Sequence, residues 1–358
     1  MSELFTPLVL RGRTLRNRIG VAPMCQYSAT DGVPDAWHHV HLVSRAVGGN
    51  ALVLTEATAV VPEGRISPGC LGIWNDAQVE AFQPITAGIR QQGALPAVQL
   101  AHAGRKASTG LPWADAGPLP PGAGGWEVVG PSPLPFDEGY PVPHELTTEE
   151  ISRVVASFRD AAKRALEAGF EAIELHAAHG YLLHSFHSPV SNRRQDAYGG
   201  DLEGRTRVTR EVVDAVRSVW PEELPLLVRL SASDWLENGG WTIDESVELS
   251  RSLATAGVDL VDCSSGGAAP GVRIPLEPGY QVPFAERIRR EVGLPTAAVG
   301  LITEPAQAEA IVAEGRADVV LLARESLRDP YWPRRAATEL GVQELLDAPE
   351  QYLRAWRS

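Results

Sequence analysis

The chain has 358 residues, 44% of them hydrophobic, which is enough to bury one large core without dividing into separate domains. Its formal net charge of -13 argues against a nucleic acid or an anionic membrane as a partner, because both require clustered positive charge. Three scattered cysteines are too few for a disulfide framework, and neither a secretory signal nor a bilayer-spanning run is visible, so we expect a cytoplasmic protein.

Eight short apolar segments are candidate buried strands. In chain order they are Ile19–Ala22, Ala51–Thr55, Leu95–Leu100, Phe170–Leu175, Leu226–Leu230, Val258–Cys263, Thr296–Val299 and Arg316–Leu322. Several follow a helical stretch that ends in glycine, as at Gly169, Gly257 and Gly315, and glycine can take the left-handed conformation that ends a helix. Strands that alternate with helices imply parallel βαβ units, and eight of them favour one (β/α)8 barrel over residues 1–358. A doubly wound open sheet is the alternative.

Residues 111–144, after the third strand, differ from the rest of the chain. The prolines and glycines of this segment are incompatible with a long helix or a central strand. They are Pro118, Pro120, Pro121, Gly122, Gly124, Gly125, Pro131, Pro133 and Pro135. Long loops in compact domains are usually functional or disordered. We interpret the segment, with Trp126, as a lid over the active face of the barrel; a disordered insertion is the alternative.

A strong helix signal follows the lid. Thr147 and Glu150 have the spacing of a capping box, and Gly169 ends the helical pattern. The expected apolar stripe consists of Ile151, Val154, Val155, Phe158, Ala162 and Leu166.

Two histidines three residues apart, His176 and His179, follow the fourth strand, and Tyr181 lies two residues further on. Polar groups at the carboxyl end of a barrel strand are typical of an active site. On its own the pair is equally compatible with hydrogen-bonded histidines that start a helix.

Polar motifs of one kind follow five of the expected strands. They are Pro23-Met24-Cys25-Gln26-Tyr27, the run from Gln99 to Lys106, the run from His176 to Tyr181, Arg229, and Ala323-Arg324. Together they resemble the Old Yellow Enzyme family of flavin-dependent ene-reductases, and the resemblance extends over essentially the whole chain. Cys25, Tyr27 and Arg334 are similar to the thermophilic-like branch of that family.

The resemblance implies noncovalent FMN as cofactor. It assigns Gln99 to the pyrimidine edge of the flavin and Arg229 to N1 and O2, where a cation stabilises the reduced ring. The phosphate is expected after the seventh and eighth strands, the usual phosphate corner of such barrels. The remaining cofactor contacts that the resemblance implies are Pro23, Met24, Cys25, Ala57, His176, Gly300, Ala323 and Arg324.

The resemblance also implies a reaction, with NADPH or NADH as reductant of the flavin. His176 and His179 are expected to donate hydrogen bonds to the oxygen of an enone, maleimide or nitroalkene. Hydride then passes from flavin N5 to the β-carbon, and Tyr181 protonates the α-carbon. Cys25 is expected to tune the flavin, and Tyr27 to line the substrate pocket.

The tail, residues 328–358, concentrates arginine with aromatic residues, a composition found at interface anchors. In the thermophilic-like branch the arginine that matches Arg334 reaches the substrate site of a neighbouring subunit. We therefore expect a homodimer or homotetramer with a shared site; the alternative is that these arginines only solvate the last helix.

Two other functions stay open at this level. A metal-dependent barrel hydrolase could use histidines from the set His38, His39, His41, His184 and His187, although the first three fall in a helical pattern rather than at a strand end. A non-catalytic flavin-binding protein is the other alternative. We expect no metal.

Overall fold

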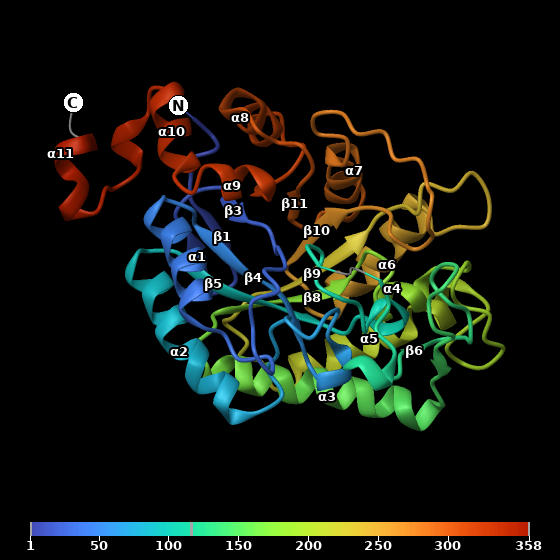
Figure 1. Ribbon diagram of the computed structural model, residues 1–358. Helices are drawn as coiled ribbons and strands as arrows, with labels where there is room; N and C mark the ends of the chain where they lie inside the picture. The colour runs from blue at the N-terminus through green and yellow to red at the C-terminus, as the bar shows by residue number, and fades with distance from the viewer. Residues whose placement is uncertain (1, 115–116, 357–358) are drawn as a thin grey trace.

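The computed structural model describes residues 2–114 and 117–356. Eight parallel strands form a closed barrel (Figure 1), so the predicted (β/α)8 fold is confirmed and the open-sheet alternative is wrong. The strands are β3 (Ile19–Val21), β4 (Leu52–Ala59), β5 (Leu95–Ala101), β8 (Ala172–Ala177), β9 (Leu226–Ser231), β10 (Leu260–Ser264), β11 (Thr296–Ala298) and β12 (Val319–Leu322). Each overlaps one of the eight segments expected from the sequence.

Helices surround the barrel on its outer side (Figure 1). The longer ones are α1 (Ala36–Val47), α2 (Asp76–Gln91), α3 (Thr148–Glu167), α5 (Leu202–Arg217), α6 (Ile243–Thr255), α7 (Val282–Val292), α8 (Pro305–Ala313) and α10 (Trp332–Glu339). Shorter helical segments are η1 (Pro62–Gly64), η2 (Gly104–Lys106), η3 (Pro121–Ala123), α4 (Leu182–His187), α9 (Arg324–Arg328), η4 (Gln343–Leu345), η5 (Glu350–Tyr352) and α11 (Leu353–Trp356). Across the described part of the chain, no helix is both long and apolar enough to cross a membrane.

Along several strands, the residues that face the barrel interior change from apolar to polar toward the carboxyl end. On β8, Ala172 belongs to the inner apolar cluster, whereas Ile173 and Leu175 pack in the outer cluster between strands and helices. Side chains alternate across a strand, so Glu174 and His176 face the interior above Ala172. β9 and β10 repeat this order. The carboxyl end of the barrel is therefore its polar end.

The opposite end of the barrel is filled by apolar side chains. An antiparallel hairpin of β1 (Leu8–Leu10) and β2 (Arg13–Leu15) adds Leu10 and Leu15 to the inner apolar cluster. In the described part of the chain, apolar packing therefore closes this end of the barrel, and the carboxyl end is where we expect ligands to enter.

The helix predicted after the lid is α3, and its Thr147 capping box is present. Ile151, Phe158 and Ala162 are fully buried. Leu166 was wrongly assigned to the buried stripe, since 39% of it is exposed. It lies in the last turn of α3, where Ala165 and the following Ala168 are fully buried, so Leu166 is at the edge of the buried face of the helix.

The expected lid contains η3 and two short parallel strands, β6 (Val129–Gly130) and β7 (His144–Glu145). Trp126 donates from Nε1 to the Glu63 carbonyl at 2.8 Å. The Arg65 guanidinium lies over the Trp126 ring, 4.9 Å from the ring centroid. Residues 115–116 of this segment, and 357–358 of the tail, lie outside the described residues.

Candidate active site

Polar side chains from neighbouring strands meet in one layer at the carboxyl end of the barrel. In the strand registers, Ala57 pairs with Gln99, and His176 pairs with Arg229. Residues in register on parallel strands share a face, so their side chains gather in one place although they are far apart in the sequence. Pro23 and Met24 follow β3 at the same end of the barrel.

A buried network underlies this layer. Gln99 donates from Nε2 to Glu174 Oε1 at 2.8 Å, and Arg229 Nε lies 3.0 Å from Asp262 Oδ2. All four residues are at most 6% exposed. Burial, together with the nearby Asp262 carboxylate, raises the pKa of Glu174 well above its usual range. Burial also raises the pKa of Asp262. Both shifts favour the protonated form of these carboxyl groups, so we expect the pair to hold a proton to a higher pH than exposed carboxyl groups do.

The structure brings His176, His179 and Tyr181 together. His176 Nε2 and His179 Nδ1 are 3.4 Å apart, with their rings perpendicular. The Tyr181 ring lies 5.0 Å from the His176 ring and 6.5 Å from the His179 ring. Burial and the Arg229 charge lower the pKa of both histidines well below the usual value, so both are neutral. A single ligand oxygen could contact both facing nitrogens.

The hydrogen bonds of the two rings limit their tautomers. The Ala178 N–H donates to His176 Nδ1 at 3.3 Å, so the proton of a neutral His176 is on Nε2. His179 Nε2 is 2.7 Å from Ser264 Oγ. The single hydroxyl proton of Ser264 can be donated to His179 Nε2 or to Gln281 Oε1, 3.4 Å away; donation to His179 puts the His179 proton on Nδ1 and makes both facing nitrogens donors. The sequence analysis missed Ser264, although polar residues at alternate positions of a buried strand are a readable signal.

Cys25 and Tyr27 lie on the segment that follows β3. A hydrogen bond with the Cys70 thiol and burial raise the pKa of Cys25 well above its usual range, so it is a thiol rather than a thiolate. Burial raises the pKa of Tyr27, whose ring packs edge-on against Trp113 at 5.9 Å. Tyr27 has a φ of 51°, a left-handed conformation that is uncommon for tyrosine. The segment 111–144 therefore contacts this side of the site through Trp113.

A cavity of about 290 Å³ opens beside Arg229 and is also lined by Gly300, Ala323 and Arg324. Gly300 has a φ of 120°, and a Cβ at this position would lie 2.9 Å from Gln281 Nε2, so only glycine suits it. Within the described residues Arg324 is in no ion pair, and the neighbouring Glu325 pairs instead with Arg328 and Arg335.

These residues fit FMN. Gln99 and Arg229 supply donors for an acceptor-rich ring edge, and Arg324 places a second cation at the cavity, which suits a phosphate in a protein of net charge -13. The glycine at position 300 allows close approach of the backbone.

Arg334 lies in the tail, away from this group. It is 8% exposed, donates from Nη2 to the Asp347 carbonyl at 2.6 Å, and stacks under Trp356 at 4.2 Å. Within its own chain, Arg334 is therefore part of the tail's packing.

The histidines of the metal-site alternative have other contacts. His38 bridges Asp35 and Glu56 at 2.7 and 3.4 Å, and His187 bonds the Thr209 hydroxyl at 2.6 Å. Among the residues described here, no three or more His, Cys, Asp or Glu side chains are grouped to hold a metal ion.

The fold and the site define a class of protein, the oxidoreductases that hold a flavin at the carboxyl end of a (β/α)8 barrel. The chain belongs to the NADH:flavin oxidoreductase / NADH oxidase family, the Old Yellow Enzyme family, whose model matches residues 3–343. Its cofactor is FMN, and its reductant is NADPH or NADH.

Individual relatives agree with this assignment. An NADPH dehydrogenase of Geobacillus thermodenitrificans is 49% identical over 99% of this chain and 98% of its own. Among solved structures, 2-naphthoyl-CoA reductase superimposes with a TM-score of 0.86 at 26% identity over 96% of this chain, which spans only 53% of that protein. An old yellow enzyme homologue from Zymomonas mobilis superimposes with a TM-score of 0.78 at 27% identity, over 99% of this chain and 96% of its own.

Proposed function

We propose that the protein is an ene-reductase that uses NADPH or NADH to reduce alkenes activated by a carbonyl or nitro group. The observation that carries this proposal is the 3.4 Å separation of His176 Nε2 and His179 Nδ1, with Tyr181 beside them. Bound FMN supplies the hydride, and the three side chains handle the substrate oxygen and the proton.

The two histidines would bind the substrate oxygen as neutral donors. Their lowered pKa values favour this role, since a neutral imidazole donates one directed hydrogen bond and adds no buried charge. Negative charge develops on the oxygen as hydride adds to the β-carbon. A preorganised donor to such an oxygen is typically worth about 10²–10³ in rate.

Tyr181 would deliver the proton to the α-carbon. Burial raises its pKa well above the usual value, so the hydroxyl holds its proton until a strongly basic carbon forms nearby. Such a group suits a general acid that acts late in the reaction. Cys25, as a neutral thiol, would tune the flavin potential and contact the substrate.

We also propose a homodimer or homotetramer in which the tail contributes to the interface. α1 leaves Trp37 and Val40 52% and 61% exposed, and the tail leaves Tyr352 43% exposed. The Arg334 Nη2 atom donates to the Val47 carbonyl at 3.3 Å, which links the tail to the end of α1. For Arg334 to reach a partner's substrate site, it would have to leave its contact with Asp347.

The three cysteines are free thiols in the structure, which supports a reducing compartment such as the cytoplasm. The proposed location can be checked by fractionation.

The function is tested first by absorbance and turnover. Purified protein should be yellow, should bleach with NADPH under argon, and should regain colour with cyclohexenone. Bleaching without reoxidation by any activated alkene would favour a non-catalytic flavin protein, and colourless protein that FMN cannot reconstitute would refute the assignment.

The acid is tested by Tyr181→Phe. This variant should slow alkene reduction by about 10²–10⁴ while flavin reduction by NADPH continues, the range for loss of a general acid. Equal losses in both half-reactions would remove Tyr181 from this role.

A further inference from the structure

Tyr181 and His179 are joined by a turn whose backbone is held by side chains from outside the catalytic group. His179 and Gly180 have φ values of 60° and 73°, so the turn is left-handed at two successive positions. Such a conformation persists only where its surroundings fix it. The contacts around residues 178–181 therefore decide how the two catalytic side chains lie relative to each other.

Three side chains bind successive polar groups of this turn. The His179 N–H donates to Ser231 Oγ at 2.9 Å, and Lys106 Nζ donates to the His179 carbonyl at 2.8 Å. The Gly180 N–H donates to His184 Nδ1 at 2.8 Å. The last two bonds hold the two ends of one peptide group, the one between His179 and Gly180, which lies one residue before Tyr181.

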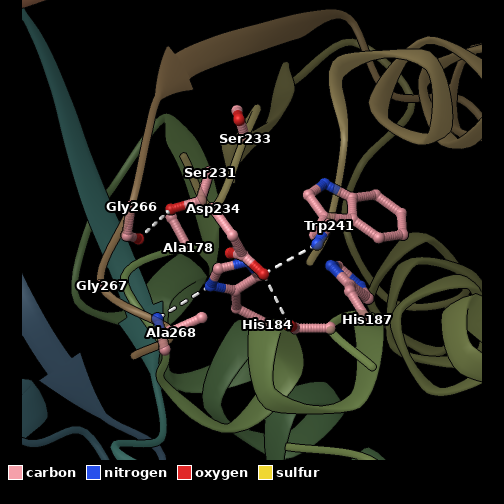
Figure 2. A network of polar contacts seen from close by, with 12 residues as sticks. Ala178, His184, His187, Ser231, Ser233, Asp234, Trp241, Gly266, Gly267 and Ala268 are labelled. Carbon is pink, nitrogen blue, oxygen red and sulfur yellow. Dashed lines mark hydrogen bonds and ion pairs between the residues drawn. The ribbon is translucent and has the colours of Figure 1, made fainter. Parts of the chain in front are cut away.

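His184 is in turn oriented by a buried carboxylate. His184 Nε2 lies 3.2 Å from Asp234 Oδ1, and neither atom has another hydrogen-bond partner in the described chain. The other oxygen, Asp234 Oδ2, accepts from the Ser188 hydroxyl at 2.6 Å and from the backbone N–H of Trp241 at 2.8 Å. Figure 2 shows the Asp234 carboxylate directly above the His184 ring, with Trp241 on its other side.

This arrangement fixes the tautomer of His184. Because Nδ1 accepts from Gly180, the proton of the neutral ring is on Nε2, facing the carboxylate. Burial opposes ionisation of Asp234, but the His184 ring and the hydrogen bonds from Ser188 and Trp241 outweigh it and lower the pKa of Asp234. A charged Asp234 therefore keeps Nδ1 free to accept.

We propose that the His184–Asp234 pair is a positioning device for the turn 178–181. The Gly180 peptide joins the residue that holds the substrate oxygen to the residue that delivers the proton, so rotating this peptide would change the relative placement of both. Misplacement by about 1 Å can cost about 10²-fold in rate. The inference rests on the proposed function, since it assigns the pair a role through Tyr181.

The neighbouring buried histidine provides a matched control. His187 lies on the same helix, with its ring 5.0 Å from Trp241 and 6.1 Å from His184, and it bonds Thr209 at 2.6 Å but has no hydrogen bond to the turn. His187→Phe should lower stability without changing the turn.

The experiment uses the FMN-loaded enzyme and compares His184→Phe, His184→Asn and the control His187→Phe. His184→Phe removes the acceptor for the Gly180 N–H and should slow cyclohexenone reduction by about 10²-fold, more than it slows flavin reduction by NADPH. His184→Asn keeps an acceptor oxygen near the position of Nδ1 and should retain most of the rate. Amide hydrogen exchange of residues 177–183 should rise in His184→Phe only. If His184→Phe does not fold, His184→Ala takes its place.

The Tyr181→Phe background separates this inference from the proposed function. In that background His184→Phe should have a smaller further effect on alkene reduction than in the wild type, because the proton donor is gone and only the placement of His179 is left to disturb. If Tyr181→Phe alone leaves alkene reduction intact, the proposed acid is wrong. If Tyr181→Phe slows the reaction but His184→Phe matches His187→Phe in rates and exchange, the positioning role is refuted and the acid assignment stands.

Discussion

In Glu174→Gln, the free energy of unfolding should fall less than in the wild type as the pH rises from 5 to 8. In the structure Glu174 accepts from Gln99 at 2.8 Å, and burial with the Asp262 charge raises its pKa well above 4.5. Glutamine can accept the same bond through its carbonyl and can donate to Asp262 through its amide, as a protonated Glu174 would. The substitution therefore preserves the hydrogen bonds and removes the need to hold a proton.

The sign follows from proton linkage. Below the unfolded pKa, near 4.5, both folded and unfolded chains bind the proton, so the wild-type group contributes its full stability. Above it, the unfolded chain releases the proton while the folded chain keeps it, so stability falls as the pH rises until the raised folded pKa is passed. One proton corresponds to at most about 1.4 kcal/mol per pH unit.

The assay is urea denaturation at pH 5, 6, 7 and 8 with FMN in fixed excess, repeated on flavin-free protein because ligand binding shifts apparent stability. The free energy of unfolding of Glu174→Gln minus that of wild type should rise with pH. Glu149→Gln, at a side chain that is 84% exposed, is the control for loss of a surface charge. A difference that stays constant from pH 5 to 8 would show that the folded pair does not retain the proton.

Three further substitutions test other parts of the structure. Gly267→Ala should destabilise the protein by about 1–3 kcal/mol in urea and impair alkene reduction, because the new Cβ would lie 2.6 Å from the His179 Cα at a φ of 90°; unchanged stability would contradict the packing of this loop on the turn. Thr147→Ala should cost about 1 kcal/mol through loss of the α3 cap, and no change in denaturation midpoint would argue against the capping box. Arg334→Ala should loosen the tail by removing the hydrogen bond to the Asp347 carbonyl. Proteolysis of the tail should then be faster, while the strands stay protected from amide hydrogen exchange. Scattering on the same variant tests whether the oligomer persists.

The sequence by itself determined the barrel. Short apolar runs located all eight strands, and several of these runs follow a helical stretch that ends in glycine, because both the stop signal and the hydrophobic period are local features of the chain. The α3 cap was readable for the same reason, since Thr147 and Glu150 are only three residues apart. The family motifs also placed the histidine pair and Tyr181 at the strand end where they lie.

What surrounds those residues depends on contacts between distant segments. Ser264 lies 85 residues from His179, whose ring it bonds, and Gln99 lies 75 residues from Glu174. No local pattern pairs such positions; strand register does, and register is set when the sheet closes into a barrel.

This dependence on contacts between distant segments also explains what the sequence analysis assigned wrongly or missed. Leu166 fits the helical period but lies at the edge of the buried face, beside the fully buried Ala165, which only the packed structure reveals. His184 and Asp234 were visible in the sequence, but their partnership across the Gly180 turn was not. The period of hydrophobicity in the sequence decided which elements form and which residues point inward. Closure of the barrel decided which of these inward groups share a proton, fix each other's tautomer or contact the same ligand. Those properties depend on distances of a few ångströms between chain segments, and local propensity does not relate such segments to each other.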